Sequence, residues 1–241
     1  LIASFFFGMY FFRVAPSALS EYLMPHFGIG LREISLLTSC FFLTYTVSQI
    51  PVGYALGRYC LKKLLLGALL ICALSVQGFI YSPNFFTACL FVILYAAFAS
   101  FAFVGGVTYA KHTFPAQYLP LAVSLTQTTG MLGGFVGKNI MTSLTLHYNW
   151  HLALSSITVL LSALALIIFF FVPAIDSSNS QEESCELESS LEEPNLYTQP
   201  KTWFNALYAG CIFLPMYSLA ESVGEPMIST IHQIDLPQTT F

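Results

Sequence analysis

Long apolar runs constrain the fold of this chain more than any other feature. Seven of them are close to the roughly 20 residues that an α-helix needs to cross a hydrocarbon layer of about 30 Å. They cover approximately residues 1–24, 34–56, 63–81, 85–110, 119–143, 150–173 and 202–223. Because lipid offers no hydrogen-bond partners, such runs are expected to be helices. The sequence therefore predicts an all-α membrane protein.

Composition and charge exclude several other classes. Only 8% of the residues are charged, against about 25% in soluble domains. The net charge of −4 arises in one short stretch, since 8 Lys+Arg against the 5 Asp+Glu outside it leaves +3. The seven acidic residues of that stretch are Asp176, Glu182, Glu183, Glu186, Glu188, Glu192 and Glu193. A nucleic-acid partner is therefore not expected, and neither is a water-soluble enzyme.

Cysteine and histidine spacing predicts no metal and no cofactor. The six cysteines are scattered, without a CxxC pair. The histidines sit at expected loops or helix ends, and we expect no metal site from them. These histidines are His26, His112, His147, His151 and His232.

The chain divides into three parts by composition. Residues 1–173 hold six apolar runs and predict an N-terminal six-helix transmembrane domain. Residues 174–200 are rich in Ser, Glu, Asn and Pro, which predicts an acidic flexible cytoplasmic linker. Residues 201–241 are expected to hold the first helix of an incomplete second transmembrane domain. Because Leu1 already lies inside an apolar run, we expect a fragment at the N-terminus.

Lysine and arginine in the short loops predict the orientation. With the N-terminus inside, the inner side holds five of them and the outer side two. The inner residues are Arg58, Lys62, Lys63, Lys111 and Lys201, and the outer ones are Arg32 and Lys138. This bias predicts a multi-pass protein of the cytoplasmic membrane with its N-terminus inside.

The segment between the second and third runs resembles a known family. It is similar to the loop joining helices 2 and 3 of the major facilitator superfamily, where a glycine precedes an acidic residue and several basic ones. The matching residues are Gly53, Arg58, Lys62 and Lys63. Gly57 stands where the family has its acidic residue, and Cys60 where it has a second glycine. In the family, the acidic residue latches cytoplasmic helix ends together.

A glycine-rich segment in the fifth run carries a second resemblance. Its glycines are Gly130, Gly133, Gly134 and Gly137, with pairs four residues apart. This spacing lets another helix approach backbone to backbone. It is similar to the fifth-helix motif of the same family, whose partner there is helix 8, a helix not expected in this chain. Six helices, a linker and a seventh helix then imply the N-terminal half of a twelve-helix major facilitator fold.

Polar side chains on three expected helices favour a hydrated path. In the first run, five polar residues fall within a sector of roughly 100°: Tyr10, Arg13, Ser17, Ser20 and Glu21. Thr38, Tyr45 and Gln49 share a face of the second run, and Ser124, Gln127, Met131 and Lys138 a face of the fifth. The predicted substrate-binding residues are Tyr10, Arg13, Ser17, Tyr45, Gln49 and Gln127. Pro16 predicts a kink in the first helix.

Arg13 is the main candidate for substrate contact, because a guanidinium within a membrane helix needs compensation for its desolvation. It could bind a carboxylate or phosphate of the substrate. Alternatively, it pairs internally with Glu21 or with a carboxylate on the seventh helix. Glu21, Glu221 and Glu225 are candidates for proton coupling, or are simply solvated at helix ends.

These features predict a secondary active transporter. The resemblance implies alternating access between two six-helix halves, with a proton or ion as the usual co-transported partner. Because Arg13 could receive a carboxylate, we expect an organic anion, amino acid or short peptide as substrate. One alternative is an inactive truncated fragment of such a transporter. Another is a seven-helix receptor, which the predicted inside N-terminus and the absence of an Asn-Pro-x-x-Tyr motif disfavour.

Overall fold

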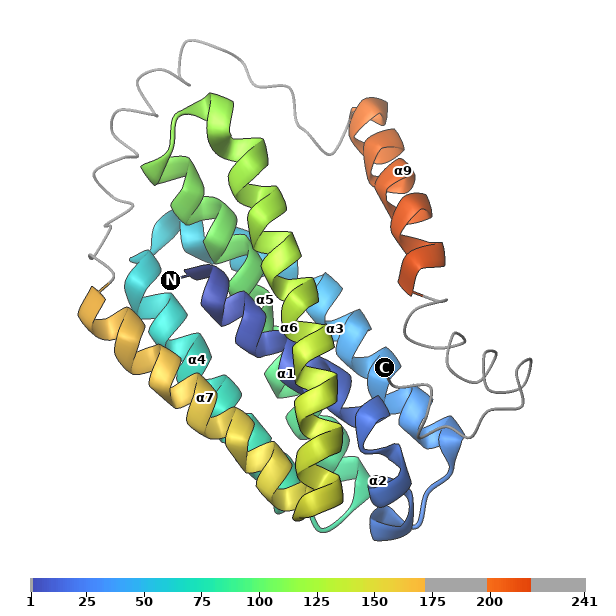
Figure 1. The fold of residues 1–241 in the computed structure, drawn as a ribbon. Helices are drawn as coiled ribbons and strands as arrows, with labels where there is room; N and C mark the ends of the chain where they lie inside the picture. The colour runs from blue at the N-terminus through green and yellow to red at the C-terminus, as the bar shows by residue number, and fades with distance from the viewer. Residues whose placement is uncertain (1, 172–198, 218–241) are drawn as a thin grey trace. The chain divides into compact units, whose positions relative to one another are not determined.

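The computed structural model describes residues 2–171 and 199–217, and all regular elements in these ranges are helices (Figure 1). The helices are α1 (Ile2–Ala18), α2 (Ser20–Phe27), α3 (Leu31–Arg58), α4 (Leu61–Ile80), α5 (Phe85–Thr113), the 3₁₀ turn η1 (Ala116–Tyr118), α6 (Leu119–His147), α7 (Trp150–Phe171) and α9 (Pro200–Tyr217). Residues 1–181 and 182–241 form two separate units. The helix α9 lies in the second unit and is the described part of the expected seventh span. The expected linker falls almost entirely outside the described residues.

The helices confirm the all-α prediction and refine its boundaries. The expected loop at residues 57–62 shrinks to Tyr59 and Cys60, because α3 continues to Arg58 and α4 begins at Leu61. A single first span at residues 1–24 is wrong, because Leu19 separates α1 from α2 with φ −107° and ψ 11°. Two neighbouring residues explain the interruption.

Pro16 and Ser17 both weaken the helix just before Leu19. Pro16 lies inside α1 and has no N–H to donate. The Ser17 hydroxyl donates a hydrogen bond of 2.9 Å to the carbonyl of Val14, a type of back-bonding that often bends helices. The interruption is local, because the Leu19 N–H still donates to the carbonyl of Ala15.

Four of the described helices are long and apolar enough to cross a membrane by length and composition: α3, α4, α5 and α7. Of the two other expected spans of the first unit, α1 is shortened to 17 residues by the break at Leu19. The other, α6, has Ser, Thr, Gln and Gly among its apolar residues. The helix α1 is therefore shorter than a full span, and α6 is less apolar than one.

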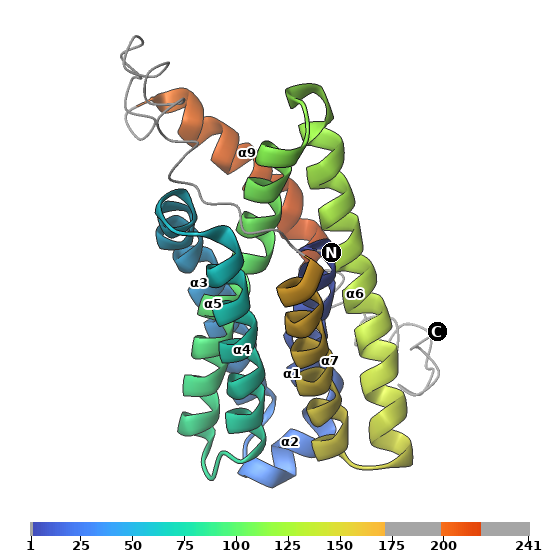
Figure 2. The ribbon, with the colours of Figure 1, turned by 90° about the vertical axis from the view of Figure 1, so that its left-hand side faces the viewer.

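The helix α1 runs through the middle of the bundle, with α5 on one side and α6 on the other (Figures 1 and 2). Its side chains Phe5, Phe6, Met9 and Phe12 are each at most 2% exposed. It also contacts α3 and α7. A central helix covered from several sides fixes the position of every residue that it carries.

Glycines on α6 allow this helix to lie directly against α1. A Cβ atom at Gly133 would come within 3.0 Å of the Phe7 backbone, and one at Gly137 would lie 3.1 Å from the Phe11 Cα. At Gly130 and Gly134 the nearest atoms belong to the Phe6 and Tyr10 rings. Among the described residues, the helix that lies against these glycines is α1 of the same unit, a helix that the sequence analysis did not name.

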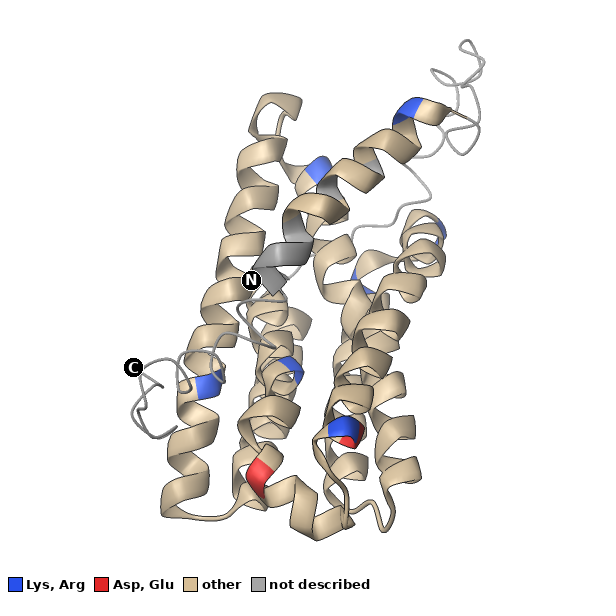
Figure 3. Ribbon diagram, turned by 90° about the vertical axis from the view of Figure 1, so that its right-hand side faces the viewer, with Lys and Arg blue, Asp and Glu red and all other residues tan. Residues whose placement is uncertain are grey.

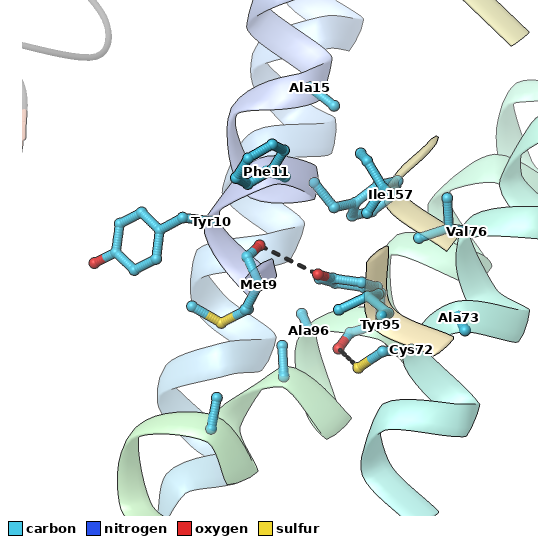
Figure 4. Packing of buried hydrophobic residues seen from close by; sticks show 14 of the residues in the cluster. Met9, Tyr10, Phe11, Ala15, Cys72, Ala73, Val76, Tyr95, Ala96 and Ile157 are labelled. Atoms are coloured by element: carbon cyan, nitrogen blue, oxygen red, sulfur yellow. Dashed lines mark hydrogen bonds between the residues drawn. The ribbon is translucent and has the colours of Figure 1, made fainter. Parts of the chain in front are cut away.

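A buried tyrosine links the central helix to α5 and α4 (Figure 4). The Tyr95 hydroxyl donates a hydrogen bond of 3.1 Å to the carbonyl of Met9, and the Cys72 thiol contacts the Tyr95 carbonyl at 3.7 Å. The Tyr95 ring also lies 4.3 Å from that of Phe12. Because Tyr95 is fully buried, this hydroxyl needs the partner that Met9 provides.

The two ends of the first unit differ in charge (Figure 3). One end, which we call the α2 end, holds α2 and the connections α4–α5 and α6–α7; both described carboxylates, Glu21 and Glu33, lie toward it. The opposite end, which we call the basic end, holds the connections α3–α4 and α5–α6 with Arg58, Lys62, Lys63 and Lys111.

We predict that Gly133→Ala destabilises the bundle, because the added methyl group meets backbone that cannot rotate away. The expected loss in the free energy of unfolding is about 1–3 kcal/mol, typical of overpacking. Reversible unfolding in mixed detergent micelles measures it. Gly67→Ala on α4 is the matched control: its Cβ would meet nothing within 4 Å, so stability should stay equal or rise by up to about 1 kcal/mol. Equal effects at both sites would contradict the packing described for α6.

Candidate substrate-binding face

Arg13 lies between two aromatic rings contributed by two helices. Its Cζ is 4.5 Å from the ring centroid of Tyr10, on the same helix, and 4.8 Å from that of Phe42 on α3. Arg13 is half-buried. A cation over the face of an aromatic ring is attracted by the negative potential of that face. The two rings thus hold the guanidinium where α1 meets α3.

The glycines of α6 determine where the Tyr10 ring lies. The ring points away from the Tyr95 side of α1 (Figure 4). A Cβ atom at Gly134 would lie 3.1 Å from its Cδ1 atom, and the Phe6 ring packs edge-on at 5.1 Å. Tyr10 is only 4% exposed. The position of the Tyr10 ring beside Arg13 therefore depends on glycines, which have no side chains, at the facing positions of α6.

The helix α3 supplies the opposite side of the guanidinium. At 100° per residue, Phe42 shares its face with the predicted residues Thr38, Tyr45 and Gln49. Tyr45 and Gln49 are half-buried, while the Thr38 hydroxyl donates to the carbonyl of Ile34 at 3.1 Å. Tyr45 also stacks on Phe41 with the ring planes 10° apart. The predicted polar face of α3 thus also carries the Phe42 ring, which a search for polar residues did not select.

The remaining predicted residues keep their places on the expected helix faces. Ser17 is exposed on α1, four residues beyond Arg13, and Gln127 is half-buried on α6. The Ser17 and Ser124 hydroxyls both donate to carbonyls of their own helices. The amides of Gln49 and Gln127, together with Arg13, are therefore the groups on these faces best suited to bind a polar solute.

The candidate coupling carboxylates are only partly described. Glu21 is exposed in the first turn of α2, beyond the break at Leu19. Glu221 and Glu225 lie outside the described residues, as would a carboxylate partner for Arg13 in the second half of the seventh span. Proton coupling through these residues stays a prediction.

The predicted loop motif forms the corner between α3 and α4 at the basic end. The Arg58 Cζ lies 4.2 Å from the Tyr54 ring centroid, and the Lys62 Nζ lies 5.4 Å from that of Phe169 on α7. Lys63 is exposed, and a Cβ at Gly53 or Gly57 would meet nothing within 4 Å. Arg58 and Lys62 thus lie over aromatic rings, while Lys63 and the two glycine positions are open.

Sequence reasoning missed Phe42 for a physical reason. A phenylalanine in an apolar run carries no polarity signal, so only its position on the face of Thr38, Tyr45 and Gln49 could have indicated it. The partner of the α6 glycines was missed because spacing predicts a close approach and does not say which helix approaches.

Comparison with known families identifies the chain. The model of the Major Facilitator Superfamily matches residues 1–236, nearly the whole sequence. The chain belongs to the major facilitator superfamily. This membership makes it an integral membrane protein of a transporter family, and it replaces the seven-helix receptor alternative. No curated protein matches the chain.

We predict that Arg13 and Phe42 are energetically coupled. In a double-mutant cycle of Arg13→Ala and Phe42→Leu, the free energies of unfolding should deviate from additivity by about 0.5–2 kcal/mol. Unfolding in mixed micelles measures all four proteins of the cycle. Replacing Phe42→Leu by Phe98→Leu, on α5 and stacked on Phe101, gives a control cycle that should be additive. Additive behaviour in the Phe42 cycle would remove the cation–π contact from the account.

Proposed function

We propose that this chain forms the N-terminal half of a secondary transporter that moves a small solute by alternating access. In such transporters two halves rock about a binding site near the middle of the membrane. The site would lie against the face of α1 that carries Tyr10, Arg13 and Ser17. The faces of α3 and α6 that hold Gln49 and Gln127 would complete the wall contributed by this half.

The position of Arg13 supports this proposal more than any other observation. The residue lies inside α1, away from both helix ends. A charged group at such depth usually faces a bundle interior or a water-filled cavity. Ser17, four residues further on the same face, is exposed. This face therefore suits a hydrated passage better than contact with acyl chains.

The guanidinium favours an anionic solute. Arginine stays charged at any physiological pH and presents a planar fork of N–H donors that matches a carboxylate or phosphate. The Arg13 Cζ lies over the Tyr10 and Phe42 rings, and the proposed contact with the solute is through the N–H groups of the guanidinium. We therefore propose an organic anion, an amino acid or a short peptide, bound through its carboxylate.

Orientation and coupling complete the proposal. The concentration of basic residues at the α3–α4 and α5–α6 connections favours an orientation in the cytoplasmic membrane with the basic end and the N-terminus facing the cytoplasm. A proton or another ion would be co-transported, with Glu21, Glu221 and Glu225 as the candidate coupling groups. The segment 174–200 would then be a cytoplasmic linker between the two halves.

Uptake by the intact protein in proteoliposomes tests the role of Arg13. With labelled organic acids, amino acids and peptides, Arg13→Ala should lower kcat/KM for the transported anion about 10- to 100-fold, the loss expected for hydrogen bonds to a charged group. Arg13→Lys should give an intermediate value, because it keeps the charge and loses the fork.

Arg32→Ala is the matched control, since Arg32 is an exposed arginine at the start of α3, and its uptake should equal that of the parent protein. Unchanged uptake by Arg13→Ala, at equal amounts of folded protein, would refute the anion-binding role and leave the family membership intact.

Cysteine labelling tests the orientation. In a version without the six native cysteines, Asn84→Cys at the α4–α5 connection should react with an impermeant maleimide in intact cells. Lys63→Cys at the basic end should react only after the membrane is permeabilised. Both positions are exposed, so accessibility to the reagent depends on the side of the membrane. The reverse pattern would invert the proposed topology.

A further inference from the structure

Two histidines that are far apart in the sequence meet at the α2 end. His26 lies in the last turn of α2, and His151 in the first turn of α7. Their ring centroids are 6.1 Å apart, with the ring planes at 89° to one another. Trp150 lies beside both, 3.7 Å from His151 and 4.9 Å from His26 between ring centroids. Spacing along the chain gave no sign of this pair, because the residues come from different helices.

The two perpendicular imidazoles make an edge-to-face contact, and their separation also suits a shared ion. A ring nitrogen binds Zn²⁺ at about 2.0–2.1 Å, so two imidazoles on one ion have centroids roughly 5–6.5 Å apart. The observed distance falls in this interval.

The surroundings of the pair combine a side exposed to solvent with a packed side. His26 is exposed and His151 is half-buried, so one side of the pair is open to water. Trp150 is only 7% exposed and packs against the His151 ring. This contact restricts the His151 ring before any ligand arrives, which lowers the entropic cost of binding.

We propose that His26 and His151 form a binding site for an imidazole-preferring divalent metal ion, such as Zn²⁺ or Ni²⁺, that bridges α2 and α7. Imidazole nitrogen favours these ions over Mg²⁺ and Ca²⁺, which prefer oxygen. In the described part of the chain no group of three or more His, Cys, Asp or Glu is placed to hold a metal. Water therefore completes the coordination, and the affinity is on the order of micromolar, weaker than that of closed four-ligand sites.

A bridging ion would join the short helix α2 to α7. The helix α2 follows the break at Leu19 and ends at Gly28, whose φ is 64°. Joining its last turn to the first turn of α7 adds a connection between two elements that are far apart in the sequence. Because the ion binds only when the two helices are together, it stabilises the folded bundle.

Tryptophan fluorescence provides a direct test, because the chain has only two tryptophans. The intact protein carrying Trp203→Phe leaves Trp150 as the reporter beside the site. In detergent solution, added Ni²⁺ should quench its emission saturably at micromolar concentrations, Zn²⁺ should compete and restore the emission, and Mg²⁺ should do neither. Zn²⁺ should also raise the temperature of unfolding.

Two ligand variants and one control locate the site. His26→Ala, and His151→Phe, which keeps an aromatic ring against Trp150, should each raise the Ni²⁺ concentration for half-quenching at least tenfold. His112→Ala, an exposed histidine at the basic end, should leave it unchanged. All three proteins should keep the helical content and elution volume of the parent.

The proposal is overturned if Ni²⁺ quenches His26→Ala at the same concentration as the parent, or if no saturable quenching occurs up to millimolar Ni²⁺. It is also overturned if His147→Ala abolishes quenching while His151→Phe does not, because the ion would then sit elsewhere at this end. Because the readout is metal binding, these results are independent of the transport proposal.

Discussion

The close approach of α1 and α6 determines most of what this bundle can do. The Phe7 backbone occupies the space that a side chain at Gly133 would fill, so α1 lies deep among its neighbours. Tyr95 then fixes the same helix from the other side through the Met9 carbonyl. Since an added methyl group has no space beside backbone, this packing depends on glycine chemistry. The polar face of α1 is positioned as a consequence.

The cost of Arg13 within the bundle and the gain from its rings are of similar size. Insertion scales assign about 2.5–3.5 kcal/mol to an arginine at the centre of a membrane helix. Two cation–π contacts of about 0.5–2 kcal/mol each offset a comparable amount. The rings of Tyr10 and Phe42 thus make the charge tolerable within the bundle.

The sequence predicted much of the fold because lipid imposes a simple rule on helix length. The spans, the loop motif at Arg58 and the glycine spacing near Gly133 were all evident from the residues. The break at Leu19 arises from the combined effect of Pro16 and Ser17, and residue spacing alone does not say whether that effect is large enough to interrupt the helix. The neighbours of Arg13 and the pairing of His26 with His151 arise from contacts between helices. Such contacts leave no periodic signal in one sequence. The sequence therefore predicted which helix faces carry the site, and it could not predict which side chains of other helices they contact.

The central claim is that the polar faces of α1, α3 and α6 meet water inside the membrane. Thiol labelling of single cysteines with a hydrophilic reagent tests it most directly, in the intact protein without its native cysteines. The account predicts that cysteines replacing Ser17, Gln49 and Gln127 react, and that saturating substrate protects them. Cysteines replacing Leu74 on α4 and Val159 on α7, both 69% exposed on apolar helices, should stay unreactive. Reaction at Leu74 and Val159 with none at Ser17, Gln49 and Gln127 would contradict the hydrated passage.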